Sequence, residues 1–191
     1  MEVNFKNLEK SICDTIKEGQ IKLGYEKETM TLYYPISSLQ SLLDLKITKE
    51  KEEEEILKMT AYMENFKDFV SNRLGTIKIS NKSARFSFTI PTEGVRYVHE
   101  SYKASQTFLE FVHLVSRPGV SLDQIMDLFH KFSPDVNCLN SDNMDFDYII
   151  YFEDSKIDPY LYCVKFHGFG HGHVSYHRYL KSDFDELMGN I

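Results

Sequence analysis

Residues 76–91 read Thr-Ile-Lys-Ile-Ser-Asn-Lys-Ser-Ala-Arg-Phe-Ser-Phe-Thr-Ile-Pro, which is the clearest β-hairpin pattern in the chain. Polar and apolar residues alternate on both sides of Asn81-Lys82, a pair that suits a two-residue turn. With the turn there, one face collects the apolar side chains of Ile77, Ile79, Ala84, Phe86, Phe88 and Ile90. We therefore predict a hairpin that buries this face.

The opposite face of the same hairpin carries positive charge. The predicted register places Lys78 directly across from Arg85. Like charges at opposed strand positions are mildly destabilising. The simpler interpretation is that both long side chains extend into water. The alternative is that they meet an acidic group or an anion.

The N-terminal segment, upstream of the hairpin, has the apolar spacing of a helix. Apolar residues at steps of three and four predict an amphipathic helix that ends near Gly19 or Gly24, and its stripe comprises Phe5, Leu8, Ile12 and Ile16. Thr29–Tyr34 alternates and predicts a short strand, with Thr31 and Tyr33 on one side, which Pro35 stops. The chain therefore begins as helix and strand.

Two more helices are predicted before the hairpin. Ser37 with Gln40 forms the pattern of a capping box, which predicts a short helix through Leu45. Thr48 opens the longest periodic segment, which Gly75 closes. Its apolar stripe comprises Ile56, Met59, Met63, Phe66, Val70 and Leu74.

Downstream of the hairpin, residues 92–116 return to helical spacing and predict one helix central to the core, with Val98, Tyr102, Leu109 and Val112 on its stripe. Because this helix and the one that carries Phe66 have the longest apolar surfaces, we predict that they pack against each other. Ser121 with Gln124 predicts a second capping box and a further short helix.

The last third of the chain predicts an antiparallel β-meander. Its strands are expected at residues 147–153, 160–167 and 171–179, with a loop at 137–143 before them and a helix at 182–188 after them. No repeat, low-complexity linker or composition change marks a boundary. We therefore expect residues 1–191 to form a single α+β domain, with several amphipathic helices, an N-terminal-half β-hairpin and a C-terminal antiparallel β-meander.

Composition limits the partners and the compartment. The 191 residues carry 22 basic and 29 acidic side chains, for a net charge of −7, which disfavours nucleic acid and anionic membranes but leaves a local basic patch open. Cys13, Cys138 and Cys163 are odd in number and far apart, which is not a disulfide framework. Without a signal-peptide pattern or a long apolar stretch, we expect a cytoplasmic protein with no membrane association.

Histidines gather in residues 167–178, which read His-Gly-Phe-Gly-His-Gly-His-Val-Ser-Tyr-His-Arg. With Gly168-Phe-Gly170 as a hairpin loop, His167, His171 and His173 share one face, while Val164, Phe166 and Val174 share the other. Opposed strand residues have Cβ atoms about 5 Å apart, so three imidazoles could converge on zinc or another divalent metal. Such an ion could activate water for ester or amide hydrolysis.

Other interpretations of this stretch stay open. No named zinc motif is present, Lys165 on the same face would oppose a cation, and strand histidines also occur on ordinary half-exposed sheets. Cys163 and His177 lie near each other diagonally across the predicted hairpin, which allows a dyad, although an inert thiol is the simpler interpretation. Since the known nucleophile and phosphate-binding motifs are missing, we assign no catalytic and no cofactor-binding residues.

Residues 90–100 read Ile-Pro-Thr-Glu-Gly-Val-Arg-Tyr-Val-His-Glu, and residues 169–178 read Phe-Gly-His-Gly-His-Val-Ser-Tyr-His-Arg. These stretches resemble an uncharacterised bacterial family known as a domain of unknown function. The resemblance covers most of the chain and implies no activity, cofactor or catalytic residue. The leading hypothesis is a cytoplasmic binding or regulatory module for a protein or a small ligand. The alternative is a metal-dependent hydrolase that uses the histidine cluster; the oligomeric state is left open.

Overall fold

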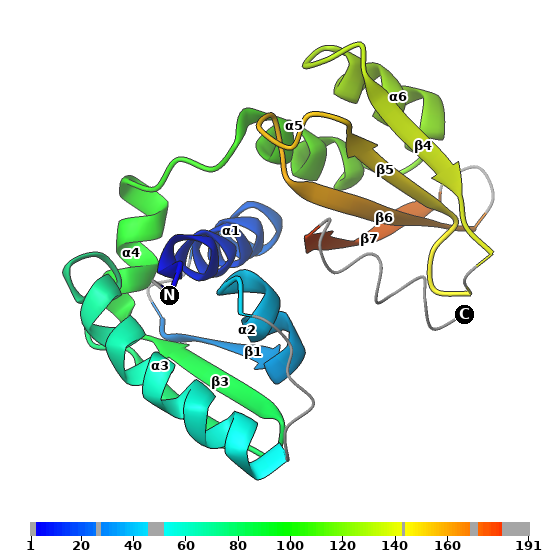
Figure 1. The fold of residues 1–191 in the computed structure, drawn as a ribbon. Coiled ribbons are helices and arrows are strands. Elements are labelled where there is room, and N and C mark those ends of the chain that lie inside the picture. Colours follow the sequence, from blue (N-terminus) through cyan, green and yellow to red (C-terminus); the bar gives the residue numbers. More distant parts are fainter. Residues whose placement is uncertain (1–2, 26–27, 46–51, 143, 169–171, 181–191) are drawn as a thin grey trace. The chain divides into compact units, whose positions relative to one another are not determined.

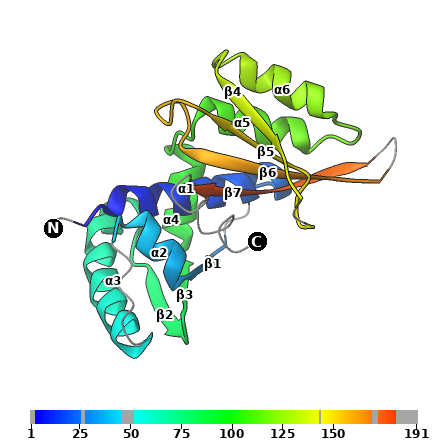
Figure 2. The same ribbon diagram turned by 45° about the vertical axis from the view of Figure 1, so that its right-hand side comes forward.

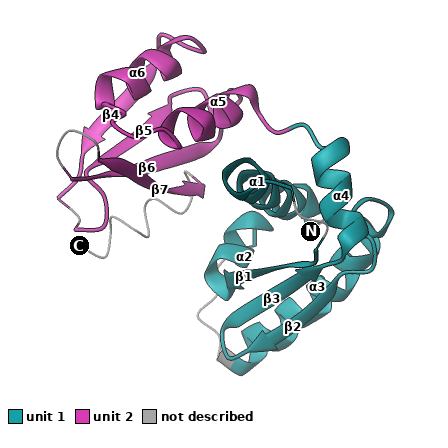
Figure 3. Cartoon of the chain, turned by 180° about the vertical axis from the view of Figure 1, so that it is seen from behind, with its two compact units in different colours: residues 1–103 teal, residues 104–191 magenta. Residues whose placement is uncertain are grey.

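The computed structural model describes residues 3–25, 28–45, 52–142, 144–168 and 172–180. Within them, six helices and two antiparallel sheets of three and four strands form an α+β fold, as predicted (Figure 1). The chain divides into two compact units, residues 1–103 and residues 104–191 (Figure 3). Because compactness does not show whether each unit folds alone, the single domain stays a prediction.

The described residues of unit 1 form four helices and a three-stranded sheet of order β1-β3-β2. Its elements are α1 (Phe5–Leu23), β1 (Met30–Pro35), α2 (Ile36–Leu42), α3 (Glu52–Leu74), β2 (Lys78–Lys82), β3 (Arg85–Ile90) and α4 (Thr92–Glu100). The hairpin of β2 and β3 lies beside α3 (Figure 2). Strand β1 pairs with β3, so the predicted strand and the predicted hairpin join in one sheet.

The hairpin buries the predicted face, but its turn is two residues later than predicted. Residues Ile77, Phe86, Phe88 and Ile90 are buried, which confirms the face. The turn is Ser83-Ala84, with Ser83 at φ 53°, and Lys82 rather than Lys78 pairs with Arg85. In the predicted register Ile90 would lie opposite Arg73, beyond the end of β2. The observed register differs from the predicted one by an even number of residues, so the same side chains stay on the buried face. It also pairs Phe88 with Ile79.

Helix α3 packs on both α1 and α4, and the ring of Phe66 contacts Phe5 of α1 and Phe88 of β3. A Cβ on Gly94 of α4 would lie 2.4 Å from the Leu74 carbonyl oxygen, so α4 approaches the end of α3 through a glycine. The predicted packing is therefore confirmed for α4, which carries Val98, but not for Leu109 and Val112, which lie on a separate helix in the second unit. The prediction of one helix over residues 92–116 is wrong, because α4 ends at Glu100 and Ser105 caps a new helix by accepting a hydrogen bond from the Phe108 amide.

Helix ends follow the predicted glycines, whereas one predicted cap is wrong. Gly24 and Gly75 have positive φ and follow the last residues of α1 and α3. Helix α2 starts at Ile36, directly after β1, and its N-cap Pro35 makes no side-chain bond. The predicted capping box of Ser37 and Gln40 is therefore absent, because the preceding strand already sets the start of the helix. Thr48 lies outside the described residues.

Unit 2 contains two helices and a four-stranded sheet of order β4-β5-β6-β7 within its described residues. Its elements are α5 (Gln106–Val115), α6 (Leu122–His130), β4 (Val136–Asn140), β5 (Tyr148–Phe152), β6 (Tyr160–His167) and β7 (His173–Leu180). The capping box of Ser121 and Gln124 is confirmed. The predicted loop at 137–143 is wrong over its first part, because β4 pairs with β5. The predicted helix at 182–188 lies outside the described residues.

Aromatic side chains join the helices of unit 2 to one face of its sheet. Tyr162 of β6 contacts Phe111 of α5 and Phe129 of α6, with ring centroids 4.7 and 5.0 Å apart. The even-numbered side chains therefore pack on the helices, as predicted. The other face is not wholly polar, because Leu161 and Cys163 are buried in a second cluster with Phe146 and Ile149.

None of the helices within the described ranges combines the length and the apolar character that a membrane crossing requires.

Candidate functional site

The histidine hairpin brings two of its three predicted metal ligands together. The predicted Gly168-Phe-Gly170 loop would place His167 opposite His171, but strand pairing places His167 of β6 opposite His173 of β7. The predicted register is therefore wrong by two residues, an even shift that keeps the same face. The rings of His167 and His173 stack with centroids 4.6 Å apart and planes 10° from parallel. His167 Nε2 also lies 2.7 Å from Ser175 Oγ. The predicted shared face is thus confirmed for these two histidines, while His171 lies outside the described residues.

The described part of the hairpin supplies a pair of imidazoles rather than a complete metal site. Among the described residues, no group of three His, Cys, Asp or Glu side chains could hold an ion. Lys165, which shares the face, donates a hydrogen bond to the Met144 carbonyl. A structural or catalytic zinc site needs at least three protein ligands, so the third would have to come from His171. Zinc at His167, His171 and His173 therefore stays a prediction.

If the histidine hairpin binds metal, replacing His171 and His173 together by alanine is expected to abolish metal uptake with the fold intact. Two of the three proposed ligands would be lost, and one imidazole does not hold zinc against water. The measurement is the zinc, iron and manganese content of untagged protein. The matched control replaces His113 and His130, two exposed histidines on α5 and α6, by alanine. Equal metal content in both double variants would reject the site.

Cys163 lies opposite His177, the arrangement that a Cys–His dyad would need. However, Cys163 is buried, and burial raises its pKa to about 12. A nucleophilic cysteine needs the opposite shift, toward a stable thiolate near neutral pH. Cys163 is therefore the inert thiol of the simpler interpretation.

Thiol labelling at pH 8 is expected to modify Cys138 first and the other two cysteines only on unfolding. Cys138 is half-buried, whereas burial is the main cause that raises the pKa of Cys13 and Cys163 to about 12. The pKa of Cys13 and Cys163 in the folded chain therefore exceeds the ordinary 9.0. The contribution of these two neutral thiols to the free energy of unfolding is complete below pH 9 and is lost as the pH rises toward 12. Cys138→Ser should remove the early reaction. Early labelling that persists in this variant would contradict the prediction.

A second candidate site is the face of the three-stranded sheet that points away from its buried side. The pairing of the strands arranges its side chains in three rows across the sheet: Thr31–Thr89–Lys78, Tyr33–Ser87–Ser80 and Pro35–Arg85–Lys82. We call these residues the outer face. Three of them are cations, four carry aliphatic hydroxyls, one is an exposed tyrosine, and none is acidic. A face of this composition suits an anion.

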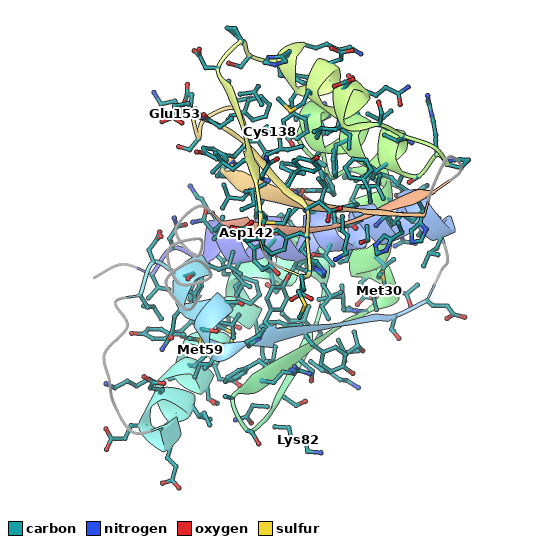
Figure 4. All side chains as sticks on the ribbon, turned by 90° about the vertical axis from the view of Figure 1, so that its right-hand side faces the viewer. Met30, Met59, Lys82, Cys138, Asp142 and Glu153 are labelled. Carbon is teal, nitrogen blue, oxygen red and sulfur yellow. The ribbon has the colours of Figure 1, made fainter. Side chains whose placement is uncertain are left out.

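Positive charge on the outer face is not neutralised by the described residues. No ion pair within the described ranges involves Lys78, Lys82 or Arg85, all of which are exposed. Lys82 pairs across the strands with Arg85, and its side chain extends away from the ribbon (Figure 4). Residues 1–103 hold equal numbers of basic and acidic residues, so the acidic excess of the chain lies in residues 104–191. The outer face therefore belongs to the less acidic half of the chain.

The outer face is hollowed at two of its three rows, the row of Tyr33 and the row of Arg85. A depression of about 720 Å³ is lined by Tyr33, Ser80, Lys82, Arg85 and Ser87, together with the turn at Ser83-Ala84. The Oγ atoms of Ser80 and Ser87 lie 2.8 Å apart and form a hydrogen bond. Ligand sites in proteins commonly have volumes of about 300–1,000 Å³. The depression is thus large enough for a small organic anion.

The sequence pointed to only part of the outer face. Its alternation placed Lys78 and Arg85 on one side of the hairpin and raised the anion as an alternative. It also placed Thr31 and Tyr33 on one side of the first strand. The missing step was the pairing of β1 with β3, which brings Tyr33 beside Ser87. Pairing between strands so far apart in the chain leaves no local signal.

Comparison with known proteins gives a family but no activity. No curated protein and no solved structure matches the chain. One family model matches residues 5–188. The chain accordingly belongs to the bacterial family described as "Domain of unknown function, E. rectale Gene description (DUF3877)".

Proposed function

We propose that this protein is a cytoplasmic binding module that takes a small anionic ligand on the outer face of its three-stranded sheet. The observation that carries the proposal is the set of Lys78, Lys82 and Arg85 on one exposed face without a carboxylate among its positions. An ionised phosphate or carboxylate would offset the repulsion between the opposed Lys82 and Arg85. The free thiols fit a reducing compartment.

Phosphate is the anion that this face suits best. The guanidinium of Arg85 can donate two parallel hydrogen bonds to one phosphate, while the ammonium of Lys82 acts as a second positive charge beside it. The hydroxyls of Ser80 and Ser87 line the same depression and can donate to further oxygens. These groups bind and orient a ligand, and the proposal assigns them no chemical step.

Pyrophosphate binding by isothermal titration calorimetry tests the proposal. The wild-type chain is expected to bind it more weakly as salt increases, because the contacts are between exposed charges. Replacing Lys82 and Arg85 together by glutamate should weaken binding by at least about 10-fold, since each charged hydrogen bond contributes about 1.5–3 kcal/mol.

The control replaces Arg96 and Lys103 by glutamate, which changes the net charge equally at two exposed positions outside the outer face. Binding should then stay within about threefold of the wild type, because distant surface charges are screened. Undetectable pyrophosphate binding by the wild type, or equal loss in both double variants, would exclude the outer face as an anion site.

The alternative function is a metal-dependent hydrolase built on the histidine hairpin. The observation in its favour is the close pair of His167 and His173. The metal content of the His171 and His173 double variant, described above, decides between a hairpin that holds an ion and one that does not. This alternative and the anion site lie in different units, so each test leaves the other intact.

A further inference from the structure

Within the proposed function, on which this inference rests, we infer that the ligand of the outer face is a mononucleotide. Tyr33 stacks on the base, and Arg85 and Lys82 hold the phosphates. The ligand would therefore combine a flat ring with an anionic group. Neither half of this arrangement is assigned by the family to which the chain belongs.

Tyr33 is the first observation that points to a ring. Its side chain is 65% exposed, although most tyrosines in the chain are buried or half-buried. Within the described ranges no ring contact involves Tyr33, whereas its neighbour Tyr34 packs on Phe88 from the buried side of the sheet. An exposed aromatic side chain on a sheet offers its π-face to a nucleobase, and every base can stack on it.

The position of Tyr33 relative to the cations is the second observation. Tyr33 pairs with Ser87 of β3, and Arg85 lies two residues along β3 on the same face. Such diagonal neighbours on adjacent strands are about 7–8 Å apart. A nucleotide also separates its base from its phosphates by a sugar, so one molecule can reach both side chains. The hydroxyls of Ser80 and Ser87 lie in the same row as Tyr33, next to the row of Arg85 and Lys82, and would contact the sugar.

Charge favours a mononucleotide over a polynucleotide. The three cations of the outer face match the charge of a nucleoside diphosphate or triphosphate. A long nucleic acid would extend beyond this face and experience the net charge of −7 of the whole chain. The depression of about 720 Å³ is also of the size that encloses one small ligand.

The test compares ADP with pyrophosphate on the wild type and on two variants, Tyr33→Ala and Tyr33→Phe. The wild type should bind ADP about 5- to 150-fold more tightly than pyrophosphate, the range that stacking of one base gives. Tyr33→Ala should remove this difference, because ADP then loses the stacking contact that pyrophosphate does not make. Tyr33→Phe keeps the ring and should keep the difference. Because Tyr33 is exposed, circular dichroism should show the same fold in all three proteins.

The outcomes separate this inference from the proposed function. Equal affinities for ADP and pyrophosphate, or an ADP preference that survives Tyr33→Ala, would overturn the mononucleotide while leaving the anion site in place. Tighter binding of a ten-residue oligothymidylate than of ADP, lost in Tyr33→Ala, would overturn it in favour of single-stranded nucleic acid. If pyrophosphate does not bind at all, the proposed function fails first and the inference fails with it.

Discussion

Replacing Phe66 by alanine is expected to lower the free energy of unfolding by about 3–5 kcal/mol, the usual cost of deleting a buried phenyl ring. Phe66 lies on α3 and is 0% exposed. Its ring contacts Phe88 of β3 edge-on, with centroids 6.2 Å apart, and Phe5 of α1 at 5.7 Å. Three elements of unit 1 therefore border the cavity that the variant would leave.

Urea unfolding followed by far-ultraviolet circular dichroism measures this loss, because the chain has no tryptophan to serve as a fluorescent probe. Leu57→Ala is the matched control, since Leu57 lies on the same helix and is 73% exposed. This variant should change stability by less than about 0.5 kcal/mol. If the two variants lose similar amounts, Phe66 is not the centre of the packing in unit 1.

Replacing Asp158 by alanine is expected to cost about 3–5 kcal/mol, because a buried carboxylate with several donors would be removed. Asp158 is 2% exposed. Its oxygens accept hydrogen bonds from the Tyr162 hydroxyl at 2.8 Å, the Tyr160 amide at 3.0 Å and the Ser105 hydroxyl at 3.1 Å. The three donors would lose their acceptor in a dry environment.

The surroundings of Tyr162 keep its hydroxyl available to donate to Asp158. The Arg178 guanidinium lies 4.7 Å from the Tyr160 ring centroid and 3.7 Å from that of Phe108. Burial, followed by the negative charge of Asp158, raises the pKa of Tyr162 well above its usual range, and Arg178 opposes the shift. The Tyr162 hydroxyl therefore stays protonated and continues to donate to Asp158 in neutral solution.

The Asp158 variant is compared with Asp135→Ala, which removes an exposed carboxylate from the same unit. Urea unfolding should separate them by at least about 2 kcal/mol, since exposed substitutions usually change stability by less than 0.5 kcal/mol. Asp158→Asn retains an acceptor oxygen and should fall between them. A stability of Asp158→Ala equal to that of Asp135→Ala would mean that the three hydrogen bonds add nothing to the native state.

Helical stripes and strand faces were predictable from the sequence by itself. The stripe of Leu8, Ile12 and Ile16 became the buried side of α1, and the parity of the hairpin selected Phe86, Phe88 and Ile90 for the core. The parity of the histidine hairpin likewise placed His167 and His173 on one face. These predictions hold because side-chain direction repeats with the local geometry of each element, every 3.6 residues in helices and every second residue in strands.

Only the tertiary structure decided which elements pair and in which register. The hairpin turn lies at Ser83-Ala84, where the longer ladder pairs Phe88 with Ile79, a gain that the local pattern does not contain. The buried cluster around Cys163 depends on Phe146, which lies outside the strands. Tyr33 joins Arg85 and Lys82 on the outer face only because β1 adds to the edge of β3. Contacts between distant segments depend on how well whole surfaces pack, and the local period of the sequence does not determine that packing.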